Sequence, residues 1–159
     1  MKSIPLSFIS LLLAVGSASA ATVTGGSALV LASLVAEHSP SLTQQQRDVM
    51  ARMLAGNLDF TFPANQKIVI QADAVSCRSS NVDITSRSCE LTFGPTRVSL
   101  KGRQAHELFA TIAEVGVPPE GAAGTIYESI SHLICTIDPN EVKQRAGGGA
   151  ACSFDQGTL

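Results

Sequence analysis

The stretch CELTFGPTRVSL, residues 89–100, carries the pattern that decides the fold class. Its apolar residues alternate with polar ones up to a Gly94-Pro95 turn, and Val98 and Leu100 alternate again beyond that turn. Two alternating runs joined by a tight turn are typical of an antiparallel β-hairpin with one buried face. The stretch therefore predicts two neighbouring strands of an antiparallel sheet.

An apolar run upstream, IVIQADAVSC at 68–77, predicts a third strand beside this hairpin. Ile68, Ile70, Ala72 and Ala74 share one face, whereas Val75 and Cys77 take the other. We expect a β-bulge near Asp73, or the end of the core-facing part of the strand at that point. The three runs together predict a meander, with a polar segment between the first strand and the second.

Helical spacing of apolar residues flanks the meander on both sides. Residues 27–37 predict a helix that is apolar around most of its circumference and must be buried. A second helix with one apolar face is expected after a cap at Ser41 or Thr43, with its stop at Gly56. Residues 103–115 predict a third helix. The short connection between the first two helices predicts a helical hairpin.

The C-terminal part of the chain is harder to assign. Residues 126–137 favour a strand, with helix as an alternative up to Leu133, because their apolar spacing is mixed. One helical turn is expected at 141–145 and a last strand at 151–154. The order helix, helix, three strands, helix, two strands predicts an α+β domain whose helices cover one face of a mainly antiparallel sheet. No repeat or linker divides residues 21–159, so we expect a single domain.

The N-terminus has the three parts of a secretory signal peptide. A charged start with Lys2 precedes an apolar run at 4–15, and small residues of the form A-x-A close the segment at 18–20. We expect cleavage before Ala21 and export to the periplasm or the medium, with an uncleaved anchor as the alternative. Neither this run nor the apolar stretch at 28–36 reaches the about 20 residues that a membrane span needs.

Charge and composition exclude some classes of partner. The chain has 11 Lys and Arg residues against 13 Asp and Glu, and loss of Lys2 with the signal peptide leaves a formal net charge of −3. No basic cluster is present, and the only aromatic residues are one Tyr and six Phe. Nucleic-acid binding needs a basic surface and uses aromatic platforms, so this class is set aside.

The four cysteines, Cys77, Cys89, Cys135 and Cys152, predict two disulfides in an exported chain. Three pairings exist, and we favour Cys77 with Cys89 and Cys135 with Cys152 because each pair brackets a turn-rich segment between strand-like runs. Zinc is the alternative, but these spacings are wider than the close cysteine pairs of structural zinc sites. We therefore expect no metal and no cofactor.

Catalytic motifs are missing from the sequence. His106-Glu107 resembles the start of H-E-x-x-H, but the position of the second His is Ala110. The sheet could bring Asp73, Asp83, Glu90 or Glu128 together as acid and base, but nothing in the sequence selects a pair among the 13 carboxylates. An enzyme remains an alternative only if Glu90, His106, Glu107 and His132 meet in three dimensions. Convergence of both histidines with a carboxylate would favour a small hydrolase.

The segment between Cys77 and Cys89 is the most informative candidate site. It places Val82 and Ile84 among polar residues inside a loop that the disulfide would hold, and we predict that these two and Arg87 contact a partner. The alternative is that Val82 and Ile84 point inward and extend the hairpin. We expect a small exported module that binds another macromolecule, as an inhibitor or an accessory subunit of an envelope or secreted enzyme. A structural envelope component is a third possibility, and the sequence leaves the identity of the partner and the oligomeric state open.

Overall fold

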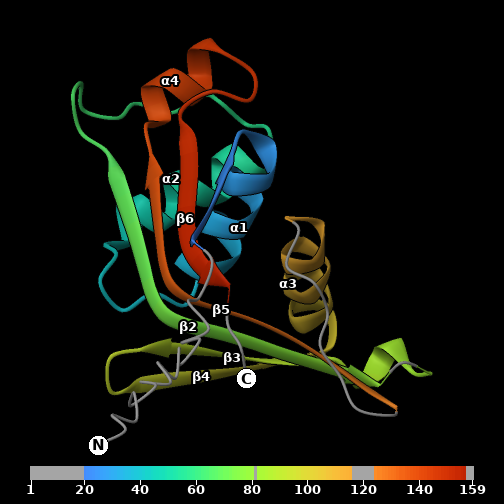
Figure 1. Cartoon of the computed structure of the whole chain (residues 1–159). Helices are drawn as coiled ribbons and strands as arrows, with labels where there is room; N and C mark the ends of the chain where they lie inside the picture. The colour runs from blue at the N-terminus through green and yellow to red at the C-terminus, as the bar shows by residue number, and fades with distance from the viewer. Residues whose placement is uncertain (1–19, 81, 116–123, 157–159) are drawn as a thin grey trace, which may run out of the picture.

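A computed structural model of the chain describes residues 20–80, 82–115 and 124–156 (Figure 1). Within these residues, six antiparallel strands form one sheet in the order β1-β6-β5-β2-β3-β4. The strands are β1 (Ala20–Thr24), β2 (Ile68–Ser80), β3 (Ser88–Phe93), β4 (Thr96–Lys101), β5 (Thr125–Ile137) and β6 (Ala150–Gln156). The predicted α+β class and the meander β2-β3-β4 are confirmed.

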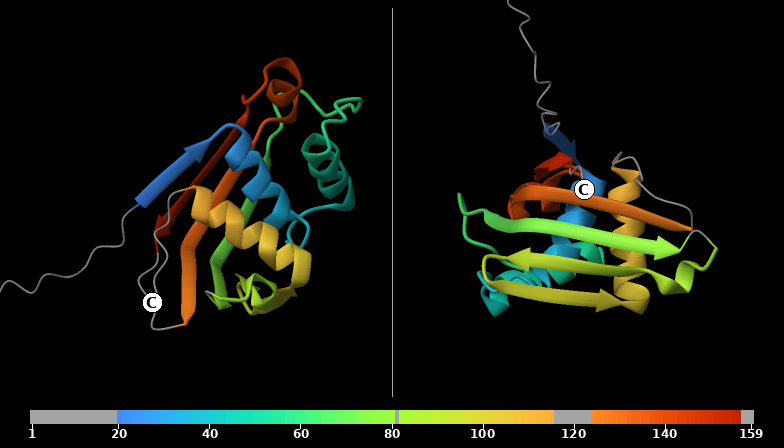
Figure 2. Two further views of the ribbon diagram at one scale, coloured as in Figure 1. Left: turned by 90° about the vertical axis from the view of Figure 1, so that its right-hand side faces the viewer. Right: turned by 60° about the horizontal axis from the view of Figure 1, so that its bottom comes forward.

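The helices gather on one face of this sheet. They are α1 (Gly26–Ala36), α2 (Gln44–Leu54), α3 (Gly102–Glu114) and α4 (Pro139–Gln144), with one 3-10 turn, η1 (Ile84–Ser86). Figure 2 shows α1 and α3 side by side over the same face of the sheet, and no described helix covers the opposite face. We call the face under α1 and α3 the inner face and the opposite one the outer face.

The two long central strands bend at the same level of the sheet (Figure 1). The buried side of β2 changes between Ala72 and Val75, so the change of face near Asp73 is present, but β2 neither shifts register against β5 nor stops facing the core there. The buried side of β5 changes in the same way between Ile130 and Leu133. Because both strands change together, their pairing register does not shift. One continuous sheet therefore curves around α1 and α3.

Apolar side chains from the inner face and the helices form the core. Fully buried members include Leu31, Ile70, Leu91, Leu108, Ile130 and Leu133. α1 is buried along most of its length, as its all-round apolar sequence predicts. α2 begins with a capping box, in which Thr43 Oγ1 accepts from Gln46 N at 3.2 Å and Gln46 Oε1 accepts from Thr43 N at 2.9 Å. Among the described residues, no helix has the length and apolar character that crossing a bilayer requires.

Both predicted disulfide pairings are confirmed. Cys77–Cys89 joins β2 to β3, and Cys135–Cys152 joins β5 to β6. Each bridge links two residues that are directly opposite in the ladder, with Cα–Cα distances of 4.1 and 4.0 Å. All four cysteines are buried.

The ends of the domain differ from the prediction. Residues 20–24 form the edge strand β1, which pairs with β6 and precedes the first predicted element at 27–37. β6 continues through Asp155 and Gln156, two residues beyond the predicted end of the last strand. Both differences arise because β1 and β6 supply each other's hydrogen bonds, and neither strand has a strong local pattern. Residues 157–159 lie outside the described part.

Candidate functional site

Internal hydrogen bonds shape the segment between Cys77 and Cys89, residues 78–88, which we call the tied loop. Asp83 Oδ1 accepts from Thr85 N at 2.9 Å and from Thr85 Oγ1 at 2.6 Å. Ser86 Oγ donates to the carbonyl oxygen of Asp83 at 2.7 Å and accepts from Ser80 N at 2.9 Å. The hydrogen bonds from Thr85 lower the pKa of the Asp83 carboxyl group, which keeps the charged acceptor in place. The described residues of the loop, 78–80 and 82–88, therefore have a defined conformation of their own.

Val82 lies at the tip of the tied loop and points into solvent. Its side chain is 90% exposed, far more than any other large apolar residue of the described chain. The alternative that Val82 turns inward and extends the hairpin is therefore wrong, because η1 interrupts the strand pattern there. The side chain of Ile84, the second predicted contact residue, lies outside the described part of the structure.

Arg87, the third predicted contact residue, links the tied loop to α3. Its guanidinium carbon is 4.4 Å from the centroid of the Phe109 ring, and its Nη1 is 2.9 Å from His106 Nδ1. An arginine can only donate, so Nδ1 of His106 is the acceptor of this hydrogen bond. These contacts hold the loop on the helix, and a contact of Arg87 with a partner stays a prediction.

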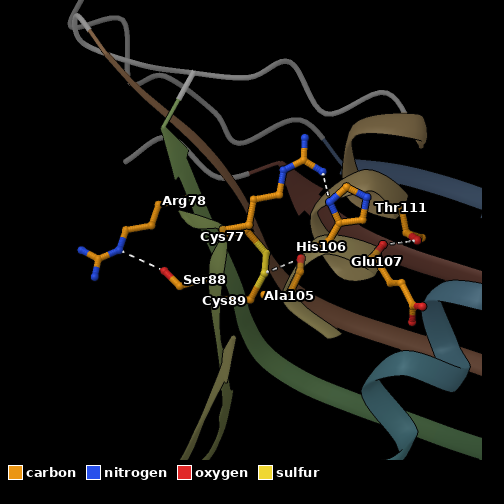
Figure 3. The surroundings of a disulfide bond; sticks show 9 residues. Cys77, Arg78, Ser88, Cys89, Ala105, His106, Glu107 and Thr111 are labelled. Carbon is orange, nitrogen blue, oxygen red and sulfur yellow. Dashed lines mark hydrogen bonds between the residues drawn. A yellow bond between two sulfur atoms is a disulfide. The ribbon is translucent and has the colours of Figure 1, made fainter. Parts of the chain in front are cut away.

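The Cys77–Cys89 bridge lies directly beneath α3, and Figure 3 shows it facing Ala105. Cys89 Sγ is 3.5 Å from the carbonyl oxygen of Ala105. Four successive cross-strand partners share this level of the inner face, and we call them the inner row: Glu128 on β5, Cys77 on β2, Cys89 on β3 and Leu100 on β4. All four are buried, so the disulfide is packed on every side at the base of the tied loop.

Glu128 is the unexpected member of the inner row. Its side chain is only 2% exposed, and its Oε2 has no hydrogen-bond partner among the described residues. Burial raises the pKa of the Glu128 carboxyl group to about 7, although the positive charge of Arg87 acts in the opposite direction. The sequence offered Glu128 only as one of four carboxylates that the sheet could bring together, yet its position between Ile126 and Ile130 on alternate residues marks an inward-facing site.

The residues of the enzyme alternative do not converge. His106 contacts Arg87, whereas His132 Nδ1 lies 2.9 Å from Asp155 Oδ2 at the irregularity between β5 and β6. The two carboxylates have other partners: Arg97 Nη1 is 3.6 Å from Glu90 Oε1, and Arg103 Nε is 2.7 Å from Glu107 Oε1. Within the described ranges, no hydrogen bond joins the two histidines to a shared carboxylate. The same ranges contain no cluster of three or more His, Cys, Asp or Glu side chains suited to a metal ion.

No protein-family model matches the chain, and no curated protein or solved structure matches it either. The function has to be inferred from the geometry of the site itself. Its main features are the exposed Val82 tip, the hydrogen bonds within the tied loop, and the attachment of that loop to α3.

Proposed function

We propose that this chain is a small exported, disulfide-stabilised module that binds another macromolecule through the tied loop, as an inhibitor or accessory subunit of an envelope or secreted enzyme. The observation that carries this proposal is the 90% exposure of Val82 at the tip of an ordered loop. Removal of an apolar side chain from water is favourable, so burial of Val82 by a partner would contribute to the binding free energy. A partner with an apolar pocket is the matching receptor.

Rigidity of the tied loop supports a binding role. The Cys77–Cys89 bridge holds its base, Asp83 organises its turn, and Arg87 fixes it to α3. A loop that is ordered before binding loses less conformational entropy when the complex forms, so more of the contact energy appears as affinity. The three attachments together favour a preformed contact site over a connecting loop.

Export is supported by the disulfides and by the position of β1. Two disulfides are typical of an oxidising compartment. Cleavage before Ala21 would remove one terminal residue of β1, and the pairs from Ala21 to Thr24 with β6 would remain. The predicted processing site is thus compatible with an intact edge strand.

The test compares two Val→Asp variants in the oxidised chain that begins at Ala21. Val82→Asp places a charge at the loop tip, and Val69→Asp places the same charge at an exposed position of β2 outside the loop. Each protein serves as bait for secreted and envelope proteins of the producing organism, with cross-linking to map the contact. We expect one partner that wild type and Val69→Asp retain and Val82→Asp loses.

Two other results would contradict this proposal. A partner retained by Val82→Asp would place the contact outside the loop tip. Absence of any partner for all three proteins would remove the support for a binding module.

One observation favours the alternative of a small hydrolase. A carboxyl group with a pKa near 7 has the property of a general acid, and Glu128 is such a group. Its side chain is only 2% exposed, so a substrate would reach the carboxyl group only after part of the structure around it moves. Hydrolytic activity that Glu128→Gln abolishes, measured on a panel of ester, peptide and glycoside substrates, would establish this alternative.

A further inference from the structure

The outer face of the sheet carries a row of four hydrogen-bond donors. Tyr127 on β5, Arg78 on β2, Ser88 on β3 and Lys101 on β4 are successive cross-strand partners, and we call them the donor row. Each is the neighbour in sequence of one member of the inner row, so its side chain points away from the helices. Figure 3 shows this for Arg78 and Ser88, which point away from α3.

Two hollows lie in this part of the outer face. The first has a volume of about 410 Å³ and contains the whole donor row, with serines and Glu90 beside it. The second, about 350 Å³, shares Arg78 and Tyr127 with the first and adds Ser80 and Ser86 of the tied loop. The donor row and the tied loop therefore line neighbouring parts of one polar surface.

Positive charge exceeds negative charge among the described residues of this surface. Arg78 Nε donates to Ser88 Oγ at 3.1 Å, and neither Arg78 nor Lys101 forms an ion pair with any described residue. Glu90 is the only carboxylate among the residues that line the larger hollow, and Arg97 faces it at 3.6 Å. The local charge is thus positive on a chain whose formal net charge is −2. Such a surface attracts anionic groups.

The donor row is also held rigidly. The Cys77–Cys89 bridge lies one residue from Arg78 on β2 and from Ser88 on β3, so it fixes the spacing of the two strands there. Lys101 is the last residue of β4 and directly precedes α3. Strands about 4.8 Å apart give a row about 14 Å long from the first strand to the fourth.

We propose that the donor row binds an extended, carboxylate-rich segment of the protein partner. This inference rests on the proposed function, because it assigns negative charge to the same partner whose apolar pocket would bind Val82. One small oxyanion cannot reach both ends of a row about 14 Å long, whereas several Asp or Glu side chains can. Arginine and lysine bind carboxylates through charge-assisted hydrogen bonds, and the hydroxyl groups of Ser88 and Tyr127 add further donors. The neighbouring apolar tip favours a protein over a sulfated polysaccharide, since only the protein offers an apolar pocket.

The probe is an acetylated, amidated hexaglutamate peptide, with hexaglutamine as its uncharged counterpart, added to the isotope-labelled mature chain. We expect hexaglutamate to shift the amide NMR resonances of Arg78, Ser88 and Lys101, and hexaglutamine to leave them unchanged. The affinity falls as salt increases, because the contacts are between exposed charges.

Two double variants test the assignment. Arg78→Gln/Lys101→Gln should weaken hexaglutamate binding about fivefold, because two exposed charge contacts are lost and their contributions to the binding free energy add. Lys67→Gln/Arg52→Gln removes the same charge from exposed positions outside the row and should bind as wild type does. Thermal unfolding of both variants checks that they fold.

Equal weakening in both double variants, or in neither, would overturn the proposal. So would a heparin fragment that binds the same residues more tightly than hexaglutamate, because the ligand would then be a polysaccharide. The same variants separate this proposal from the proposed function. If Val82→Asp loses a natural partner that Arg78→Gln/Lys101→Gln still binds normally, only the role of the donor row is overturned. If Arg78→Gln/Lys101→Gln loses the partner and Val82→Asp retains it, only the role of the loop tip is overturned.

Discussion

Glu128 lies directly opposite Cys77 across the β2–β5 ladder, so a carboxyl group shares the buried inner row with the Cys77–Cys89 disulfide. Charged residues are almost never fully buried without a partner, because removal of a charge from water is costly. The carboxyl group avoids part of this cost by keeping its proton. This relationship makes the stability of the domain sensitive to pH.

Glu128→Gln should stabilise the domain above neutral pH. Burial raises the pKa of Glu128 from 4.5 to about 7, so the folded chain keeps a proton that the unfolded chain loses. The associated stability is present in full below about pH 4.5 and is lost as the pH rises through about 7. The full difference corresponds to about 3 kcal/mol, which the amide variant retains at high pH. Urea unfolding from pH 4 to pH 8 measures the effect. Lower stability of Glu128→Gln than of wild type at pH 8 would mean that an ion pair with Arg87 outweighs the burial cost.

Removing either disulfide should cost about 3 kcal/mol of folding free energy, since each bridge closes a short loop. The two bridges differ in what they hold. Cys77→Ala/Cys89→Ala should also speed amide hydrogen exchange in the tied loop, whereas Cys135→Ala/Cys152→Ala should leave exchange in that loop unchanged relative to global unfolding. Equal exchange in the loop for the two variants would show that the Cys77–Cys89 bridge does not order it.

Arg87→Ala should detach the tied loop from α3 and destabilise the domain by about 1–2 kcal/mol, because it removes the contact with the Phe109 ring and the hydrogen bond to His106. The positive charge of Arg87 also lowers the pKa of Glu128, so its removal should move the pH dependence of stability to higher pH. Arg87→Lys keeps the charge and serves as the control. An unchanged pH profile in Arg87→Ala would contradict the electrostatic link between these two residues.

Val82→Asp should leave the free energy of unfolding within about 0.5 kcal/mol of wild type, because the side chain is 90% exposed and no packing is lost. Chemical denaturation of the two proteins under the same conditions provides the comparison. A larger loss would mean that Val82 packs against the domain, and its effect on a partner would then no longer report a direct contact.

Local sequence patterns alone predicted a large part of this structure. Alternation around Gly94 identified the β3–β4 hairpin, helical spacing identified α1, α2 and α3, and strand-flanked cysteines identified both bridges. These features depend on neighbours in sequence, where the period of the apolar residues reflects the secondary structure directly. The sequence also indicated the tied loop as a candidate site. It left open whether Val82 points outward or inward.

Other features depended on partners far apart in the chain. β1 is only a weak pattern until β6 pairs with it, and β5 has mixed apolar spacing because its buried side changes near His132. Register between strands placed Glu128 beside Cys77 and aligned Arg78 with Ser88 and Lys101. A shift of one residue would turn every one of these side chains to the other face, so composition and spacing by themselves do not define the inner row or the donor row. The sequence by itself determined which elements form, and the tertiary pairing of strands decided which polar groups are buried, exposed and brought together.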